Sequence, residues 1–235
     1  MPDAAHGGIV KIDLHTHTSH GSACAYMDPD QLVRRAQAVG LDGVCITEHD
    51  HVWDEGSIAR LRERHRFLVI GGAEVSTDHG HVLVFGLHRP VRDVYRLEDL
   101  RALADEAGAI LVMAHPFRYE PALLEDFASS SDHEELLRRI SVSLPVHLLE
   151  AIEVCNGRSG LREQALSSLL AEEVSLQGTG GSDAHAALEV GSCYSVFPGR
   201  ISSEAELLAQ LKSGSCRAVD PRWQMPTSSL STPYA

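Results

Sequence analysis

Histidines and acidic residues recur in short polar groups that directly follow apolar runs of this 235-residue sequence. His15 and His17 alternate at the end of the first run, and Asp183 and His185 repeat that spacing far along the chain. Residues two apart on a strand point to the same side, so each pair can bind one cation through both side chains. Imidazole and carboxylate groups are ligands of divalent zinc, iron and manganese. The pattern predicts a metal centre.

Further donors stand at other strand ends. His49 ends the second apolar run, Glu74 ends the third and His115 ends the fifth. The donors are too many for one tetrahedral ion, so we expect two or three divalent ions (Zn, Fe or Mn) bridged by carboxylates. Isolated histidines are usually surface residues, and we give that role to His6, His51, His65, His88, His133 and His147.

Apolar, β-branched runs alternate with segments of helical periodicity along the chain. We expect strands at 8–14, 43–47, 67–76, 81–87, 109–114, 151–155, 175–180 and 193–197, and helices at 28–40, 96–108, 132–140, 160–173 and 202–214. The four residues TDHG between the third and fourth strands are typical of a hairpin. This alternation predicts an α/β fold, and closure into a barrel is favoured because no GxGxxG turn follows a strand. The C-terminal strand ends of such a barrel share one face, where the donors would meet.

The composition of 43% hydrophobic and 23% charged residues predicts one barrel domain over residues 1–219, followed by a Pro/Ser-rich tail at 220–235. Five scattered cysteines without a CxxC spacing indicate reduced thiols. The sequence contains no long apolar stretch and its start does not resemble a signal peptide, so we expect a cytoplasmic protein without a membrane partner. Nothing in it indicates an oligomeric state.

The net charge of −13 disfavours a non-specific grip on nucleic acid, which requires a basic surface. It is compatible with a small phosphorylated substrate, because bound divalent cations reverse the local field. Extended nucleic acid is therefore not an expected partner.

Four motifs occur in order: DLHTHT, ITEHD, AHPFR and GSDAH. Together they resemble the motifs of the PHP (polymerase and histidinol phosphatase) family over residues 9–197. The resemblance implies a metal-dependent phosphoesterase on a distorted (β/α)7 TIM-like barrel, with its metal site at the C-terminal strand ends. It also implies a ligand set that includes a bridging Glu74, namely His15, His17, His49, Glu74, His115, Asp183 and His185.

The sequence departs from the family pattern at three places. A further ligand is expected soon after the first histidine pair, where we prefer Cys24 to His20. The second departure is Glu48, which replaces the usual aspartate and is expected to lie behind the ligands. The third is the ligand between Glu74 and His115, for which we choose His81 because the alternative, His79, lies in the predicted turn. Asp13 is expected to support the first histidines.

Such a centre hydrolyses a phosphate ester when a metal-bridged hydroxide attacks phosphorus in line. Asp183 or His185 could relay a proton to the leaving alkoxide. Arg118 and Arg158 follow strands on the predicted face, and we expect one of them to bind phosphoryl oxygens. Asn156 is a possible donor beside them, and residues 50–60 and 116–131 are expected to be the loops that select the substrate.

Three alternatives remain. An amidohydrolase also opens with an HxH strand, but many bridge two metals through a carboxylated lysine, and the only lysines here are Lys11 and Lys212. Glu74 could replace such a lysine. A 3'-5' exonuclease would share the chemistry but is disfavoured by the acidic charge. A non-catalytic metal-binding regulatory module would be expected to lose ligands, whereas nearly the full set is present.

Overall fold

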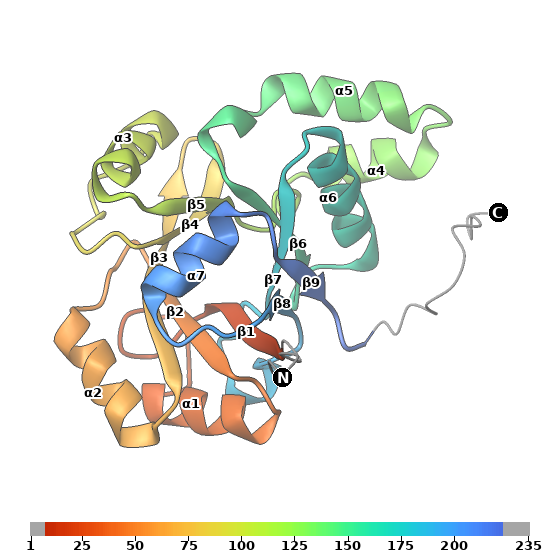
Figure 1. Ribbon diagram of the computed structural model, residues 1–235. Coiled ribbons are helices and arrows are strands. Elements are labelled where there is room, and N and C mark those ends of the chain that lie inside the picture. Colours follow the sequence, from red (N-terminus) through yellow and green to blue (C-terminus); the bar gives the residue numbers. More distant parts are fainter. Residues whose placement is uncertain (1–7, 223–235) are drawn as a thin grey trace, which may run out of the picture.

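The computed structural model describes residues 8–222, and the elements are labelled in Figure 1. The strands are β1 (Ile9–Thr16), β2 (Gly43–His49), β3 (Leu68–Thr77), β4 (Gly80–Phe85), β5 (Ile110–Met113), β6 (Ala151–Asn156), β7 (Gln177–Gly181), β8 (Tyr194–Pro198) and β9 (Arg217–Val219). The α-helices are α1 (Pro29–Ala38), α2 (Glu55–His65), α3 (Leu97–Ala107), α4 (Pro121–Ser129), α5 (His133–Ser143), α6 (Leu161–Glu173) and α7 (Glu204–Lys212). Two 3-10 turns cover Val146–Leu148 and Ala187–Glu189.

All strands belong to one sheet in the order β7-β6-β5-β4-β3-β2-β1-β8-β9. Neighbours are parallel within β1–β3 and within β5–β7, whereas β4 is antiparallel to both β3 and β5. The hairpin predicted around TDHG is therefore present. The α/β barrel expectation is confirmed, but the described sheet has nine strands and not seven, because β8 and β9 add an antiparallel pair beside β1.

The sheet nearly closes where the ends of β1 and β7 meet. A bridge joins Thr16 to Ala184, and the Asp183 amide donates to the His15 carbonyl at 2.7 Å. Two glycines permit this approach: a Cβ on Gly181 would lie 2.4 Å from Cβ of His15, and one on Gly180 would lie 2.5 Å from the carbonyl oxygen of Tyr194. The GTGG run thus brings the two ends of the sequence together at the barrel seam.

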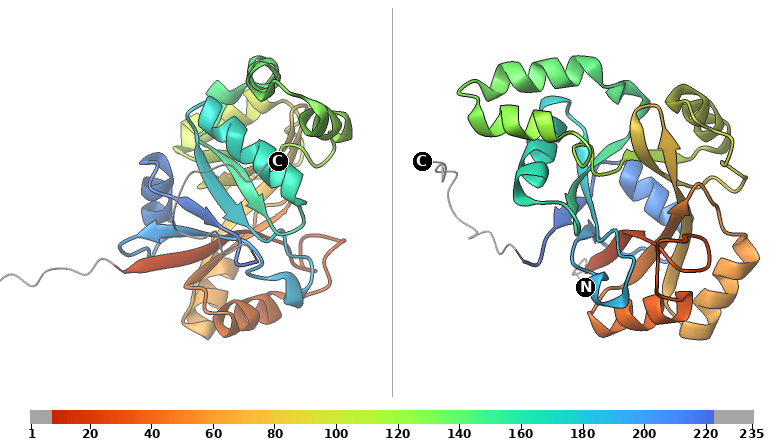
Figure 2. Two further views of the ribbon diagram at one scale, coloured as in Figure 1. Left: turned by 90° about the vertical axis from the view of Figure 1, so that its right-hand side faces the viewer. Right: turned by 180° about the vertical axis from the view of Figure 1, so that it is seen from behind.

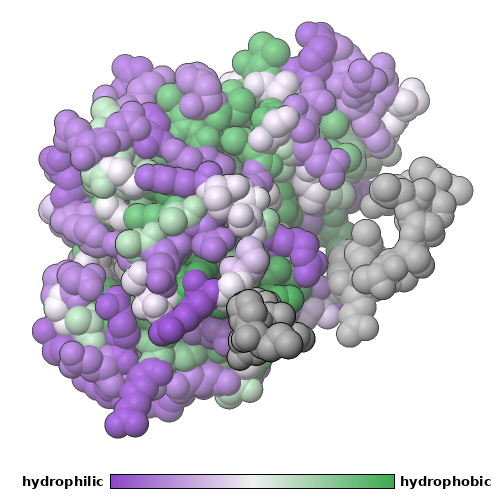
Figure 3. Space-filling view, viewed as in Figure 1, coloured by the Kyte–Doolittle hydropathy of each residue, from purple (hydrophilic) through white to green (hydrophobic). Residues whose placement is uncertain are grey.

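The barrel interior is apolar below the polar strand ends. Ile12 and Leu14 of β1 share a buried cluster with Phe85 of β4, and Leu207 and Leu211 of α7 pack into the same cluster. Helix α7 therefore covers the barrel opening that faces the viewer in Figure 1. Hydrophilic side chains cover most of this face, with apolar ones gathered between the helices (Figure 3). Within residues 8–222, no helix is both long enough and apolar enough to cross a membrane.

The first helix begins as its sequence predicts. The Asp28 side chain accepts from the Gln31 amide at 2.7 Å, the Gln31 side chain accepts from the Asp28 amide at 3.0 Å, and Pro29 occupies the first turn. Gly40 follows the helix with a φ of +76°, which an L side chain rarely adopts.

Two regions expected to be loops contain helices. Residues 50–60 include the start of α2, where the Asp54 carboxylate caps the helix by accepting from the Ser57 amide at 2.9 Å. Residues 116–131 include α4, which has Pro121 in its first turn. Ile58 and Leu61 of α2 are buried, and Leu123 and Phe127 of α4 pack partly buried against the core, so tertiary packing helps to hold both helices. Most of the expected tail, residues 223–235, lies outside the described residues.

Candidate metal centre

The predicted ligands converge at the barrel end opposite α7, which Figure 2 shows from two further sides. His81 belongs to this group because β4 is antiparallel, so its first residues lie at the same edge as the last residues of its neighbours. His115 and Asp183 have φ angles of +25° and +54°, a strained backbone that recurs at functional sites. The residues that meet here are His15, His17, His49, Glu74, His81, His115, Asp183 and His185.

Glu74 is the central carboxylate of the group, and its side chain is only 1% exposed. Its Oε1 lies 2.7 Å from Nδ1 of His81 and 2.9 Å from Nε2 of His115. Its Oε2 lies 3.3 Å from both His15 and His17 Nε2 atoms and 3.0 Å from Nδ1 of His49. Among the described residues this Oε2 makes no hydrogen bond of acceptable geometry, and a buried carboxylate oxygen rarely stays without a partner. A bound cation would supply that partner.

The protonation equilibria of the group also indicate a missing positive charge. Burial lowers the pKa of His15, but the carboxylates of Glu153, Asp183 and Glu74 outweigh it and hold that pKa well above its usual value. Burial raises the pKa of Glu74, but His15 and His115 hold it well below its usual range. The buried carboxylates thus favour positive charge at this point of the barrel. Divalent cations would supply that charge and take the imidazoles as ligands.

Four overlapping groups of three ligands can each hold an ion. Within every group the ligand atoms lie within 4.8 Å of one another, and Glu74 is the one carboxylate that belongs to two of the groups. The groups are His17, His49 and His185; His15, Glu74 and His115; His15, His17 and Asp183; and His49, Glu74 and His81. The residues present therefore fit more than one divalent cation.

Glu153 of β6 supports this group and was missed by sequence reasoning. Its Oε1 lies 3.0 Å from Nδ1 of His15, and its Oε2 accepts from the His115 amide at 3.0 Å and from Nδ2 of Asn156 at 2.9 Å. An acidic residue inside the apolar run AIEVC was the available signal, since a buried charge in a strand requires partners. Because a carboxylate only accepts hydrogen bonds, His15 carries its proton on Nδ1 and directs Nε2 toward Glu74.

Glu48 and Asp13 lie behind the ligands. Glu48 accepts from the Thr18 amide at 3.0 Å and from the Ser22 hydroxyl at 2.5 Å, and that hydroxyl lies 3.2 Å from Nδ1 of His17. Asp13 accepts from the Ser182 amide at 2.8 Å and from the His15 amide at 3.3 Å, across the barrel seam. Burial raises the pKa of Asp13 to about 6.

The two carboxylate oxygens of Asp183 have different partners, a histidine of the metal centre and an arginine. Oδ1 lies 3.3 Å from Nε2 of His17, whereas Oδ2 accepts from Arg118. Arg118 also donates to Oδ1 of Asn156 at 2.6 Å. Burial raises the pKa of Asp183, but His15, His17 and Arg118 hold it below its usual value. Asp183 is therefore prepared as an ionised ligand.

Sequence models of protein families match most of this chain. The model of the PHP domain matches residues 13–157, which is more than half of the sequence. This chain belongs to the PHP domain family. A second model, described as PHP-associated, matches residues 163–216, which contribute β7 and β8 to the same sheet and include α7 and most of α6.

Solved structures share the PHP barrel at low sequence identity. A two-domain protein from Bacteroides vulgatus that contains a predicted PHP-like metal-dependent phosphoesterase is 20% identical, with a TM-score of 0.65 over 93% of this chain and 67% of that one. PsfC from Pseudomonas syringae is 21% identical, with a TM-score of 0.63 over 92% of this chain and 94% of that one. An uncharacterized protein of Methanocaldococcus jannaschii is 21% identical over 117 residues, which are 46% of this chain and 68% of its own length. The structural likenesses show the fold.

Three sequence candidates lie outside the four groups of this PHP centre. Cys24 is exposed and lines the cavity over the centre, but it is a member of none of the groups. The His20 ring packs 4.9 Å from the Trp53 ring, and His79 lies in the turn between β3 and β4. A ligand role for Cys24 stays a prediction.

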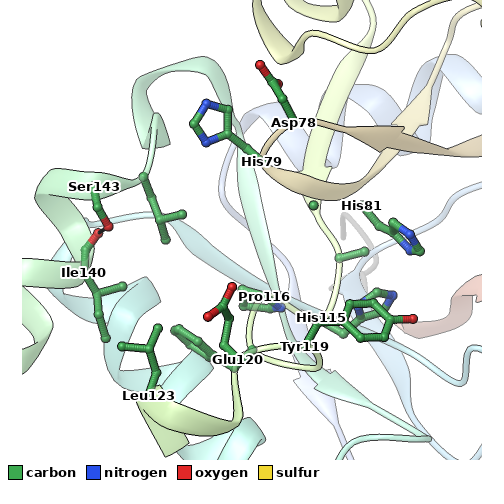
Figure 4. A pocket seen from close by; sticks show the side chains of 14 residues that line it. Asp78, His79, His81, His115, Pro116, Tyr119, Glu120, Leu123, Ile140 and Ser143 are labelled. Carbon is green, nitrogen blue, oxygen red and sulfur yellow. Dashed lines mark hydrogen bonds between the residues drawn. The ribbon is translucent and has the colours of Figure 1, made fainter. Parts of the chain in front are cut away.

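A cavity of about 560 Å³ opens over the PHP centre, and both predicted arginines line it. Arg118 is partly buried, whereas Arg158 is exposed. A second pocket of about 340 Å³ adjoins the cavity and shares its walls at His81, His115 and Tyr119. Figure 4 shows those three side chains on one wall, with Leu123, Ile140 and Ser143 opposite and the Glu120 carboxylate between them.

Proposed function

We propose that this PHP protein is a metal-dependent phosphatase that hydrolyses the phosphate ester of a small metabolite or nucleotide. The observation that carries the proposal is the buried Glu74 carboxylate, which lies within 3.3 Å of five imidazoles beneath a cavity lined by two arginines. Such a donor set suits hydrolysis without a protein nucleophile.

Divalent zinc, iron or manganese ions would be held by the eight convergent residues named above. When bound, such ions lower the pKa of a water and neutralise charge on the phosphoryl oxygens. Oδ1 of Asp183 faces the histidines and serves as a ligand, while Oδ2 remains with Arg118. Glu153 keeps the lone pair of His15 Nε2 directed into the centre.

The arginines are assigned to the phosphoryl group. Arg118 uses one nitrogen for Asp183 and another for Asn156, which fixes its planar fork at the cavity wall and leaves further N–H groups for oxygens of a phosphate. Arg158 lines the cavity without such anchoring by its guanidinium, although its backbone amide donates to Asn156 at 2.9 Å. We therefore give Arg118 the orienting role and Arg158 a supporting one.

His185 is assigned to proton transfer at the leaving alkoxide. Its Nδ1 lies 2.9 Å from the Asp183 carbonyl oxygen, which can only accept a hydrogen bond. Nδ1 therefore carries the proton, and the lone pair of Nε2 is available to bind a cation or to exchange a proton. Asp183 is less suited to this role, because its neighbours hold it ionised.

The adjoining pocket is assigned to the organic part of the substrate. Leu123, Ile140 and Leu144 give it an apolar wall, and no arginine or lysine lines it. This lining, like the net charge of −13, supports a small ester over an extended strand with regularly spaced phosphates. The free cysteines support placement in a reducing, cytoplasmic compartment.

The amidohydrolase alternative lacks its usual lysine at the site. Lys11 lies exposed on β1, and Nζ of Lys212 donates to the Gly108 carbonyl at 2.9 Å on the far side of the barrel. Glu74 occupies the central bridging place instead.

Metal analysis combined with a substrate panel tests the proposal. The purified protein is expected to carry two or three ions and to release phosphate from members of a panel of phosphosugars, nucleotides and histidinol phosphate. His15→Ala should abolish release, whereas His133→Ala, which alters an exposed histidine on α5, should not. Less than one ion per chain, or full activity in His15→Ala, would contradict the proposal.

A further inference from the structure

A second group of metal-binding side chains lies outside the catalytic centre. Cys155 of β6 is 5% exposed, Cys193, directly before β8, is fully buried, and the Asp220 side chain beyond β9 is 6% exposed. Their sulfur and carboxylate atoms all lie within 4.8 Å of one another, and none of the three belongs to the groups around Glu74. The three residues come from segments far apart in the sequence, which meet where β6, β8 and β9 adjoin in Figure 1.

Glycines bring these segments unusually close. Cys155 pairs with Gly180 of β7, where a Cβ would lie 2.5 Å from the Tyr194 carbonyl oxygen. A Cβ on Gly157 would lie 2.1 Å from the hydroxyl of Ser192. Because neither position has a side chain, the chain around Cys155 packs directly against the chain around Cys193.

We propose that Cys155, Cys193 and Asp220 form a structural zinc site at the junction of β6, β8 and β9. Two thiolates and one carboxylate are a donor set that favours Zn²⁺ over harder cations. With bond lengths of about 2.3 Å to sulfur and 2.0 Å to oxygen, tetrahedral zinc places its ligand atoms about 3.5 to 3.8 Å apart. The ligand atoms now lie within 4.8 Å of one another, so zinc binding would draw them closer together, with a water as the fourth ligand. This inference does not rest on the proposed phosphatase function.

The charges around the group suit a bound dication. Zn²⁺ with two thiolates and one carboxylate leaves one net negative charge, and the Arg222 guanidinium supplies one positive charge. Arg222 donates to Oδ1 of Asp220 at 2.8 Å and to Oδ2 at 2.6 Å, and it also donates to Sγ of Cys193 at 3.7 Å.

The site would fasten the end of the described chain to the barrel. Asp220 is also held by Gln164 of α6 at 3.3 Å, and Arg222 donates to the Gly157 carbonyl at 3.1 Å. Cys155 directly precedes Asn156, whose Oδ1 accepts from Arg118. Zinc binding therefore restrains β9 and steadies the strand that anchors Arg118.

Cobalt substitution distinguishes this site from the catalytic one. Metal-free protein titrated with Co²⁺ is expected to develop near-ultraviolet thiolate-to-cobalt charge transfer, which ligands without sulfur do not give. The band should be absent in Cys155→Ser and Cys193→Ser, retained in the matched thiol variant Cys216→Ser, and retained in His15→Ala, whose mutation weakens only the catalytic centre. Because Cys155 and Cys193 are buried, alkylation is measured at the midpoint of urea unfolding, where zinc should slow modification of these two thiols in the unmodified chain more than that of the buried Cys45.

The alkylation measurement uses the unmodified chain, so it tests zinc binding by Cys155 and Cys193 even if a serine variant fails to fold. No charge-transfer band at saturating Co²⁺ would overturn the proposal. A band lost in Cys24→Ser would also overturn it, because the thiolate would then belong to the catalytic cavity. A disulfide between Cys155 and Cys193 in the purified protein would replace the zinc site with a redox pair.

Discussion

Replacement of Glu153 by glutamine is the most informative change in the catalytic centre. Glu153 accepts three hydrogen bonds, from Nδ1 of His15 at 3.0 Å, the His115 amide at 3.0 Å and the Asn156 side chain at 2.9 Å. Glutamine can keep the last two by placing its amide oxygen at the position of Oε2. Its amide nitrogen then faces Nδ1 of His15, which must become an acceptor.

That rearrangement moves the His15 proton from Nδ1 to Nε2, the atom that faces Glu74 and His17. The hydrogen bonds of the fold are retained but the buried charge of Glu153 beside His15 is lost, so we expect the metal-free variant to lose about 1 to 3 kcal/mol of unfolding free energy. The metal centre loses a lone pair and an adjacent negative charge, and we expect ion affinity to fall by about 10-fold to 100-fold. This range corresponds to about 1.4 to 2.7 kcal/mol of binding free energy.

The two quantities are measured separately. Urea unfolding of the metal-free chain gives the stability, and competition with a chromophoric chelator gives the metal affinity of wild type and Glu153→Gln. Glu173→Gln, an exposed change on α6, is the matched control and should alter neither value. An unchanged metal affinity in Glu153→Gln would refute the tautomer argument, and a loss of stability well above about 3 kcal/mol would show that Glu153 acts through the fold.

Three further outcomes follow from the structure. Gly181→Ala drives a methyl group into the neighbouring strand and should cost about 3 kcal/mol or more in thermal unfolding, whereas Gly8→Ala, with open space around its Cβ, should be nearly neutral. Arg118→Ala should lower kcat/KM for a phosphomonoester by about 100-fold, and equal activity would remove it from the site. The hydrogen bond from His65 lowers the pKa of Asp30 below that of the unfolded chain, so its stabilisation is present above the unfolded pKa and is lost as the pH falls through the folded one. Asp30→Asn should therefore cost less than about 1 kcal/mol at neutral pH, and a difference from wild type that persists below about pH 3 would contradict this assignment.

The alternation of apolar runs with segments of helical periodicity was sufficient to predict most of the fold. All eight expected strands are present, because each is an apolar run whose burial is visible in its composition. The short strand β9 was missed, since three residues carry no periodicity. Helices α2 and α4 were missed because they lie in segments that we expected to be loops, and their contacts with the core are visible only in the folded chain.

The residues of the catalytic centre also separate into those that the sequence predicted and those that it did not. Histidine and acidic residues at strand ends pointed to seven of the eight residues that meet around Glu74, because parallel strands deliver their ends to one barrel edge, whereas His81 was chosen from the family pattern. Glu153 could not be assigned in advance, since its role depends on a contact with His15, 138 positions away. Cys24 shows the converse: its neighbours in the sequence suggest a ligand, but its loop places it at the cavity wall outside the four groups.

The types of the residues and their spacing along the sequence were thus sufficient to predict metal-binding chemistry. Both are local properties that do not depend on how the chain folds. The pairing of Asp183 with Arg118, the choice of nitrogen that carries the His15 proton and the meeting of Cys155 with Cys193 depend on how the barrel closes. That closure rests on close packing at Gly180 and Gly181, where the absence of side chains brings strands from opposite ends of the sequence into contact. Distances across that seam are properties of the folded chain, and they set which donors share a cation.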